Sequence, residues 1–374
     1  MNKICIATAA RSEYGLLRWI IDSVHHDPEL ELQLVVTGAH LSIEQGLTYR
    51  FIEEDGYPIA AKVDMHLQSD DKAAIVRSMG QCSMGIAETF CNLEPDIVIV
   101  LGDRYELLPI VSAALVMGIP IAHISGGDVT EGAIDNEVRN AVSMMSSIHF
   151  PGVDSSAKNL RRMLGECASI YTAGEPGLES FLRYNLMTRE ELAKSIGLNI
   201  NSRWCLVTLH PETKLGLEEN INMAKALFET MQESDEDVQF VISKANADYG
   251  GSHINKYWES VINLNNQKYR LFASLGQLRY LSFMKQVVGV LGNSSSGIVE
   301  APFLGIPVIN IGDRQRGRHI CKNVIQCGRT RNEISDAFSL MLKQHNVVDT
   351  YYGDGHCSAF IMEKIKLWLN TGKG

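Results

Sequence analysis

The sequence lacks the short motifs that identify several common classes of protein. Its eight cysteines form no C-x-x-C pair and no H-E-x-x-H pattern occurs, so we predict neither a disulfide framework nor a metal site. A G-x-S-x-G nucleophile elbow is missing as well. The turn after the first apolar run does not carry the G-x-G-x-x-G fingerprint of dinucleotide binding, and we predict no cofactor.

Basic side chains are in the minority. The 374 residues include 34 Lys and Arg against 44 Asp and Glu, which gives a formal net charge of −10. Proteins that bind nucleic acid or anionic lipid need a basic surface, so we expect neither as a partner. A small anionic ligand stays compatible with this charge, because it needs only a local basic patch.

An uninterrupted membrane-spanning run is also absent. Residues 107–127 carry no charge, but Pro109, Pro120 and His123 interrupt them, so we interpret the segment as a helix followed by a buried strand. The N-terminal stretch runs from apolar residues directly into Arg11 and Glu13, as a first strand does and a signal peptide does not. With free thiols inside apolar runs, this predicts a cytoplasmic protein.

Short β-branched runs alternate with amphipathic stretches along the whole chain. This alternation is typical of right-handed βαβ units in a parallel sheet, and most of the runs are apolar on both faces. We therefore predict an α/β fold with two facing Rossmann-like domains. The expected N-terminal domain covers 1–172 and is joined by a C-terminal helix within 356–374, and the second domain covers 173–355. The expected strands are 4–9, 32–38, 96–102, 120–127, 147–150, 169–174, 204–211, 238–243, 269–274, 287–297, 307–312 and 323–327.

In such sheets, ligands bind outside the carboxyl ends of the strands, so the residues that follow each strand are the candidates for the site. In the first half, Arg11 lies at a helix start, and His40 follows a glycine turn. Asp103 and Arg104 follow a fully apolar strand, where Asp103 is either a ligand group or a helix cap. A glycine-rich loop then carries several carboxylates whose mutual repulsion favours acid–base chemistry. They are Asp128, Glu131 and Asp135.

In the second half, His210 and Asn246 follow apolar strands. The segment G-N-S-S-S-G at 292–297 joins a strand to a helix and is typical of a lysine-free phosphate cradle, with a serine-capped helix as the alternative. Its candidate ligand groups are Ser294, Ser295, Gly297 and, in the helix that follows, Glu300. Arg314 belongs to a basic cluster in which residues 313–331 carry six bases and one acid.

Taken together, these segments resemble the hydrolysing UDP-N-acetylglucosamine 2-epimerases of sialic acid biosynthesis, of the bacterial NeuC type. The matching segments occur in order over nearly the whole chain. They are A-R-S-E-Y-G at 10–15, V-T-G-A-H-L at 36–41, E-P-D-I-V-I-V-L-G-D-R-Y-E at 94–106, G-G-D and I-D-N-E-V-R within 126–139, L-H-P-E-T at 209–213, G-N-S-S-S-G-I-V-E-A-P at 292–302 and G-D-R-Q-R-G-R at 312–318.

The resemblance implies the GT-B fold and a homodimer or homotetramer. It also implies that a base removes the C2 proton of UDP-N-acetylglucosamine while UDP leaves, and that water then adds to the 2-acetamidoglucal to give N-acetylmannosamine. By position, Asp103 and Asp135 match the family's acid–base carboxylates, and His210 matches the histidine beside the diphosphate. The positions that match nucleotide contacts are Arg11, Arg104, Ser294, Ser295, Glu300 and Arg314.

The chain departs from the family at the acidic loop. Many members have H-I-E-G-G-E, whereas this sequence has Ser125 and Asp128 at the two acidic positions and Glu131 in a one-residue insertion. Either Asp128 or Glu131 replaces the missing carboxylate, or the substrate is a UDP- or GDP-linked diacetamido-trideoxy sugar of the legionaminic acid route. The remaining alternatives are a GT-B glycosyltransferase, a non-hydrolysing epimerase and a non-catalytic nucleotide-sugar sensor.

Overall fold

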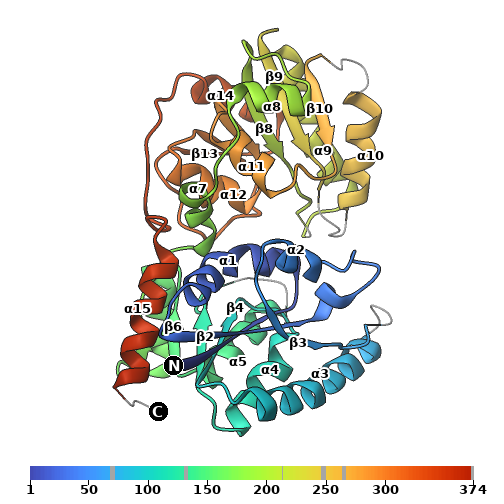
Figure 1. Cartoon of the computed structure of the whole chain (residues 1–374). Coiled ribbons are helices and arrows are strands. Elements are labelled where there is room, and N and C mark those ends of the chain that lie inside the picture. Colours follow the sequence, from blue (N-terminus) through green and yellow to red (C-terminus); the bar gives the residue numbers. More distant parts are fainter. Residues whose placement is uncertain (68–71, 130–133, 213, 246–249, 263–266, 372–374) are drawn as a thin grey trace. The chain divides into compact units, whose positions relative to one another are not determined.

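The computed structural model describes residues 1–67, 72–129, 134–212, 214–245, 250–262 and 267–371. The chain folds into two compact units (Figure 1). The N-terminal unit consists of Met1–Glu179 together with Gly353–Gly374, and the C-terminal unit is Ser180–Tyr352. The chain therefore crosses between units after residues 179 and 352, whereas the sequence placed the crossings after 172 and 355.

The N-terminal unit contains one parallel sheet in the order β3-β2-β1-β4-β5-β6-β7. Its strands are β1 (Asn2–Thr8), β2 (Leu30–Thr37), β3 (Ile59–Val63), β4 (Ile97–Leu101), β5 (Ile121–Ile124), β6 (Ile148–Phe150) and β7 (Ser169–Ile170). Its helices are α1 (Arg11–His25), η1 (Gly38–Leu41), α2 (Tyr49–Glu54), α3 (Lys72–Leu93), α4 (Leu107–Val116), α5 (Asp135–Met145), α6 (Asp154–Leu164), η2 (Pro176–Glu179) and α15 (Cys357–Asn370).

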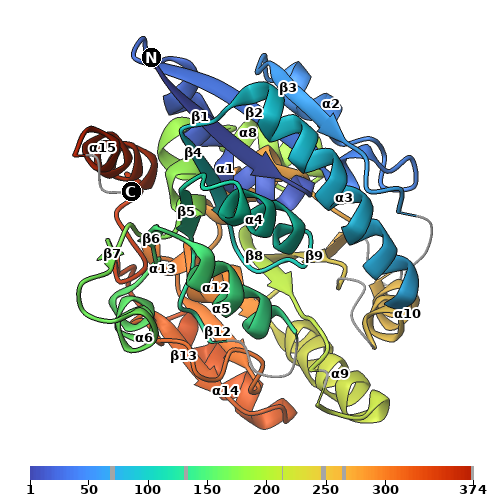
Figure 2. The same ribbon diagram turned by 90° about the horizontal axis from the view of Figure 1, so that it is seen from below.

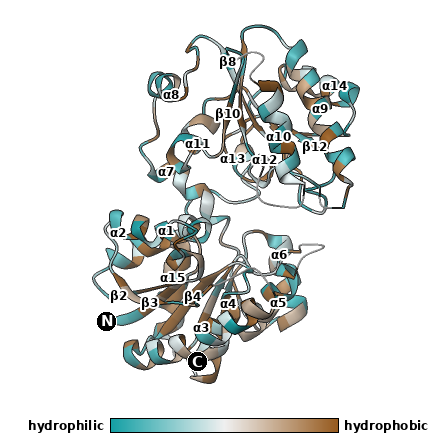
Figure 3. Cartoon of the chain, turned by 90° about the vertical axis from the view of Figure 1, so that its right-hand side faces the viewer, coloured by the Kyte–Doolittle hydropathy of each residue, from teal (hydrophilic) through white to brown (hydrophobic). Residues whose placement is uncertain are grey.

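Side chains of the central strands point alternately to the two faces of this sheet, and they are buried on both faces. Ile4 and Ile6 of β1 pack in a core with α1 and α15, while Cys5 and Ala7 pack in a second core with α3, α4 and α5. Figure 2 shows α3 and α4 side by side, and Figure 3 shows the strands of this sheet mostly in the brown of apolar residues. The continuous apolar runs of the sequence follow from this burial.

The last helix of the chain packs on the N-terminal unit, as the sequence predicted. Ile361 and Ile365 of α15 share the core of α1, and Ser358 donates its backbone N–H (2.8 Å) and hydroxyl (2.6 Å) to the buried carboxylate of Glu179. Lys366 reaches Glu29 at 3.0 Å. The contact returns the end of the chain to the unit in which the chain begins.

The C-terminal unit repeats the same plan with a parallel sheet in the order β10-β9-β8-β11-β12-β13. Its strands are β8 (Arg203–Thr208), β9 (Val238–Ser243), β10 (Tyr269–Phe272), β11 (Gly289–Gly292), β12 (Val308–Ile311) and β13 (Val324–Cys327). Its helices are α7 (Ser180–Arg183), α8 (Arg189–Ile196), α9 (Leu217–Glu233), α10 (Gly251–Ile262), α11 (Gln277–Met284), α12 (Ser295–Ile298), α13 (Glu300–Phe303) and α14 (Arg331–Met341).

Two parts of the sequence differ from expectation. Ile59–Val63 forms the edge strand β3, which sequence reasoning did not include because the strand is half-exposed and carries Lys62 rather than a continuous apolar run. The charged stretch near the expected domain boundary contains α8, which has a capping box between Thr188 and Glu191 and ends at Gly197 in the left-handed conformation. Neither element carries the continuous apolar run from which the strands were predicted.

The segment 107–127 folds as α4 followed by β5, in agreement with its interpretation as a helix and a buried strand. Among the described residues, no helix combines the length and the apolar character that crossing a bilayer requires.

The strand order reverses at one place in each sheet. β1 lies between β2 and β4, and β8 lies between β9 and β11, so the connections leave the two neighbours in opposite directions. A crevice opens at the carboxyl end of the strands at such a reversal, and this is where doubly wound sheets bind ligands. Each unit therefore has its own group of candidate residues, at the reversal of its sheet.

The packing of α15 can be tested with two residues of this helix, Ile365 and Leu367, whose side chains have the same number of atoms. Ile365 is completely buried, whereas Leu367 is 53% exposed. We expect Ile365→Ala to lower the free energy of unfolding by about 2–4 kcal/mol, since it leaves a cavity in the core. Leu367→Ala should change it by less than about 0.5 kcal/mol. Urea denaturation measures both, and equal effects of the two variants would contradict this packing.

Candidate active site

An ion pair holds Asp103 at the carboxyl end of β4. The Asp103 carboxylate accepts a hydrogen bond from Nη2 of Arg139, which is almost completely buried on α5. Nη1 of the same guanidinium donates to the backbone carbonyl of Asp128 at 2.9 Å. Arg139 therefore links Asp103 to the loop after β5. Asp103 does not cap α4, which begins at Leu107, so its alternative interpretation as a helix cap is wrong.

Asp135 is the first residue of α5 and lies near the same pair. Burial raises the pKa of Asp135, the negative charge of Asp103 raises it further, and Arg139 and Arg104 act in the opposite direction. Asp135 therefore retains a proton more readily than an exposed aspartate does, and Asp103 has a direct arginine partner. This arrangement is suited to general acid–base chemistry.

Residues 125–129, which follow β5, make close contacts within the unit. Gly127 has φ +82°, and a Cβ there would lie 2.3 Å from the carbonyl oxygen of Ser156, so only glycine fits. The hydroxyl of Ser156 donates to the carboxylate of Asp128. Ser125 has φ +60°, an uncommon conformation for a residue other than glycine. The predicted site residue Glu131 lies outside the described residues.

His123 binds within the protein through both ring nitrogens. Nε2 lies 2.8 Å from the carbonyl oxygen of Gly102 and Nδ1 lies 3.0 Å from the hydroxyl of Ser143. Burial lowers the pKa of His123 to about 3, so the ring is neutral at pH 7. This histidine joins the ends of β4 and β5.

Two predicted site residues near the end of β1, Arg11 and His40, differ in their exposure. Arg11 begins α1, is exposed and lies 4.7 Å from the ring of Phe51. His40 is completely buried: its Nε2 lies 3.1 Å from the Thr8 hydroxyl and its Nδ1 lies 2.9 Å from the Thr48 hydroxyl. Burial lowers the pKa of His40 to about 4. His40 has no exposed atom that could contact a ligand in this structure.

Arg104 extends from the β4–α4 loop with one part of its side chain anchored. Its Nη2 donates to Glu106 at 2.6 Å; the Glu106 side chain is 1% exposed, whereas that of Arg104 is 41% exposed. Burial opposes the charge of Arg104, but the bond to Glu106 raises its pKa overall. The guanidinium therefore presents a permanent positive charge at the carboxyl end of this sheet.

In the C-terminal unit, Asn293 connects three strand ends. Its Oδ1 accepts the backbone N–H of His210 at 2.8 Å, and its Nδ2 donates to the His210 carbonyl at 2.9 Å. Its own carbonyl accepts from Arg314 Nη1 at 3.0 Å and from Gln315 at 2.8 Å. Asn293 is 1% exposed. One buried amide thus fixes the backbone of His210 and orients Arg314, which follow β8 and β12.

The predicted phosphate cradle follows β11 directly. Ser294 is the N-cap of the short helix α12 and its hydroxyl accepts from the N–H of Ser296, as the serine-cap alternative predicts. Ser296 also contacts the hydroxyl of Tyr280 at 2.5 Å. Ser295 begins α12 and is exposed, so its hydroxyl is accessible to a ligand.

Two further candidates lie beside this turn. Glu300 begins a second short helix, α13, rather than the first turn of the same helix, because the helix is interrupted at Val299. Burial raises the pKa of Glu300, and the charge of Arg318 opposes that shift. Gly297 is buried, and a Cβ there would lie 3.1 Å from Val308, so this glycine serves close packing of α12 on β12.

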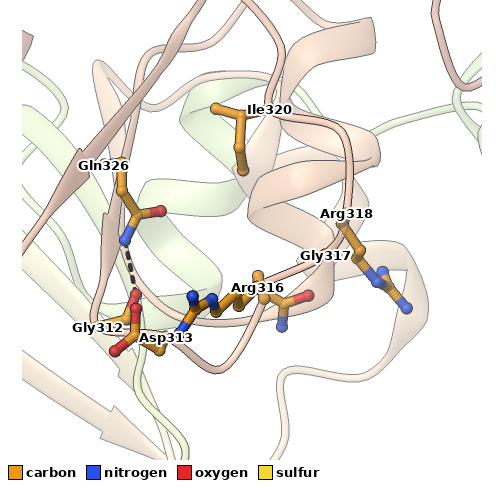
Figure 4. A pocket seen from close by; sticks show the side chains of 8 residues that line it. Gly312, Asp313, Arg316, Gly317, Arg318, Ile320 and Gln326 are labelled. Atoms are coloured by element: carbon orange, nitrogen blue, oxygen red, sulfur yellow. Dashed lines mark hydrogen bonds between the residues drawn. The ribbon is translucent and has the colours of Figure 1, made fainter. Parts of the chain in front are cut away.

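The basic cluster after β12 divides into paired and outward-facing arginines. Arg329 forms two bonds to Glu212, at 3.0 and 2.7 Å, and one to Asp313 at 2.7 Å, and Arg331 pairs with Glu233. Arg316 and Arg318 are exposed instead, and with Gly312, Gln315 and Gln326 they line a cavity of about 220 Å³ (Figure 4). The local excess of positive charge is therefore smaller than the sequence count suggests.

Sequence reasoning missed several residues on which the site depends. Arg139, Glu106 and Asn293 lie inside the quoted motifs, but their roles need the fold, because their partners are distant in the chain. Asn246, a predicted contact, lies outside the described residues. Among the described residues, no group of three His, Cys, Asp or Glu side chains is arranged to hold a metal ion.

Comparison with known families gives one match over most of the chain. Residues 22–366 match the family described as UDP-N-acetylglucosamine 2-epimerase. A Campylobacter jejuni GDP/UDP-N,N'-diacetylbacillosamine 2-epimerase (hydrolyzing) is 37% identical over 90% of this chain and 86% of its own. The Escherichia coli polysialic acid biosynthesis protein P7 is 32% identical over 89% and 84%. The Legionella pneumophila UDP-N,N'-diacetylbacillosamine 2-epimerase (hydrolyzing) is 29% identical over 98% and 96%.

Solved structures confirm the predicted fold. The Methanocaldococcus jannaschii UDP-GlcNAc 2-epimerase, solved in complex with UDP-GlcNAc and UDP, superposes with a TM-score of 0.77 at 21% identity, covering 98% of this chain and 99% of that one. A putative UDP-N-acetylglucosamine 2-epimerase from Listeria monocytogenes gives a TM-score of 0.79 at 18% identity over 99% and 97%. At these identities the likeness establishes the two-domain GT-B fold.

The role of Asn293 can be tested directly. Asn293→Ala removes the two bonds to His210 and leaves backbone groups without partners, so we expect the free energy of unfolding to fall by about 1–3 kcal/mol. Hydrogen exchange of the His210 amide should accelerate in the same variant. Asn201→Ala, at an exposed position, is the matched control. Unchanged exchange at His210 in Asn293→Ala would rule out this anchoring role.

Proposed function

This chain belongs to the UDP-N-acetylglucosamine 2-epimerase family, and we propose that it is a hydrolysing 2-epimerase of a nucleoside-diphosphate-linked 2-acetamido sugar. The observation that carries the proposal is the pair of carboxyl groups at the carboxyl end of the N-terminal sheet: Asp103, which Arg139 holds, and Asp135, whose pKa the charge of Asp103 raises. Removing a proton next to a sugar's anomeric carbon, and returning one, requires such a base and acid.

In the proposed reaction Asp103 is the base. It takes the proton from C2, the C2–H electrons form the C1–C2 double bond, and the C1–O bond to the diphosphate breaks with its electrons on the leaving oxygen. Asp135 is the acid: in the second step it supplies a proton to C2 on the opposite face while water adds at C1 and its remaining proton passes to solvent. Exchange with solvent then removes the proton from Asp103 and restores the proton of Asp135. The products are the free 2-epimer and the nucleoside diphosphate, so the overall reaction consumes one water.

The nucleotide is assigned to groups of the C-terminal unit. The oriented guanidinium of Arg314, the accessible hydroxyl of Ser295 and the serine-capped turn at Ser294 support diphosphate binding there. Glu300 is proposed as a ribose contact, and His210 as the group beside the diphosphate and sugar. Arg11 and Arg104 are proposed to contribute positive charge from the N-terminal unit. We assign neither His40 nor Gly297 a contact, because both are buried for structural reasons.

For the sugar, we favour a 2,4-diacetamido-trideoxy sugar on UDP or GDP. Two similar proteins carry the name of diacetylbacillosamine 2-epimerases, and Ser125 supplies a small neutral side chain where many family members have glutamate. UDP-N-acetylglucosamine, with N-acetylmannosamine as the product, is the second candidate, supported by the similarity to a polysialic acid biosynthesis protein. Asp128, held by Ser156 near the Asp103–Arg139 pair, is the described candidate for the carboxylate that replaces the family glutamate.

We further propose a cytoplasmic homodimer or homotetramer. The eight cysteines are free, which suits a reducing compartment. Several apolar side chains of α3 and α4 are exposed, which is typical of a surface that associates with another chain. They are Val76, Met84, Leu115 and Val116.

The reaction type can be tested by product analysis in heavy water. The protein is incubated without acceptor with UDP-N-acetylglucosamine and with UDP- and GDP-linked diacetamido-trideoxy sugars, and products are identified by NMR. We expect free nucleoside diphosphate together with a free sugar that is inverted and deuterated at C2. Deuterium in a sugar still attached to its nucleotide indicates a non-hydrolysing epimerase. Release of a free sugar that carries no deuterium at C2 would contradict the proposal. If the nucleotide sugar is not converted in the absence of an acceptor, the result supports a glycosyltransferase.

The acid–base pair can be tested by two variants. We expect Asp103→Asn and Asp135→Asn each to lower kcat by about 10²–10⁴-fold, while Asp336→Asn, at an exposed position, leaves it unchanged. Because Asp135 acts as an acid with a raised pKa, kcat of the wild type should fall as pH rises through that pKa. A sensor without catalysis would retain its function in both variants, and variants with wild-type kcat contradict the assignment.

A further inference from the structure

Three charged side chains of the N-terminal unit influence one another: Arg104 and Glu106 form an ion pair at 2.6 Å, and Glu13 interacts electrostatically with both. Glu13 comes from the first turn of α1, and Arg104 and Glu106 come from the loop after β4. The two glutamates are 3% and 1% exposed. Two buried carboxyl groups thus lie behind one arginine whose side chain is partly exposed. None of the proposed acid–base steps uses either glutamate.

Glu13 and Glu106 have different hydrogen-bond partners. Oε1 of Glu106 accepts from Arg104 at 2.6 Å. Oε2 of Glu13 accepts from the backbone N–H of Ala9 at 2.5 Å and from the hydroxyl of Thr8 at 3.3 Å. The other carboxyl oxygen of each glutamate, and Nε of Arg104, are buried without a hydrogen-bond partner among the described residues. Arg104 therefore neutralises Glu106 directly, and Glu13 is the carboxyl group without a direct cation.

The surroundings of Glu13 favour its neutral form near pH 7. Burial raises the pKa of Glu13 to about 7, and the charge of Glu106 adds to that effect, whereas the Ala9 N–H, Arg104 and Thr8 oppose it. Thr8, which donates to Glu13, also lies 3.1 Å from Nε2 of His40 in η1, and burial lowers the pKa of His40 to about 4. Arg104 stays charged over the same range. Glu13 is thus the member of the cluster whose charge changes near neutrality.

We propose that Glu13 is a positioning residue whose carboxyl group controls how strongly Arg104 binds the diphosphate of a nucleotide sugar. With Glu13 protonated, the cluster of one cation and one carboxylate is neutral, and the exposed part of the guanidinium can interact with an anion. With Glu13 ionised, the cluster carries a net negative charge that repels the diphosphate and competes for Arg104. The inference rests on the proposed function only in its choice of ligand.

The test measures binding rather than turnover. UDP-N-acetylglucosamine is the probe, because its diphosphate diester does not titrate between pH 6 and 8.5. The Asp135→Asn protein is the background, since it removes the titration of Asp135 and is expected to lower turnover by about 10²–10⁴-fold. We expect the affinity, measured by calorimetry, to fall by about three- to tenfold from pH 6 to 8.5. Adding Glu13→Gln should retain the high affinity at both pH values, with less than a twofold change.

Two further variants separate this role from a loss of folding. Glu54→Gln, at an exposed position on α2, should leave the pH dependence unchanged. Thr8→Val removes a hydrogen bond that stabilises the ionised Glu13, so the fall in affinity should shift to higher pH. The inference is overturned if Glu13→Gln shows the same fall as its parent, if Thr8→Val does not shift it, or if the probe does not bind. Failure of the proposed function appears separately, as absence of turnover by the wild-type protein.

Discussion

All strands of both sheets are parallel, and the N-terminal sheet is buried by helices on both faces, so polar side chains have few places within it. A charged group in the middle of such a strand would be buried without water, at a cost of several kcal/mol. The residues that carry chemistry are therefore concentrated at the carboxyl ends. The two places where the strand order reverses select which ends can approach a ligand.

The two units use this common plan for different chemistry. In the N-terminal unit, the strand ends carry carboxyl groups in different surroundings: Arg139 pairs with Asp103, and burial raises the pKa of Asp135. In the C-terminal unit, the corresponding ends carry an amide, serines and arginines, and Asn293 holds the His210 backbone and Arg314 in fixed positions. The first arrangement suits proton transfer, and the second suits binding of a diphosphate.

Much of the fold could be predicted from the sequence, because burial on both faces produces continuous apolar runs. The twelve predicted strand segments overlap strands β1, β2 and β4–β13, whereas β3 was missed because its half-exposed face leaves no such run. The positions of Asp103, Asp135, His210 and Arg314 after strands were predictable from the same rule. The sequence could not predict which polar side chains form their hydrogen bonds within the protein and are therefore not available to a ligand. His40 and Ser294 follow strands as well. However, both ring nitrogens of His40 contact threonine hydroxyls inside the protein, and the Ser294 hydroxyl caps a helix.

We propose that the C-terminal unit binds the nucleotide and that the carboxyl groups of the N-terminal unit move protons. The affinity of UDP for Arg314→Met and for Asp135→Asn, measured by calorimetry, tests this division of roles. The account predicts that Arg314→Met lowers the affinity by about tenfold or more, whereas Asp135→Asn changes it by less than about threefold. A loss of UDP binding in Asp135→Asn together with wild-type binding in Arg314→Met would contradict it.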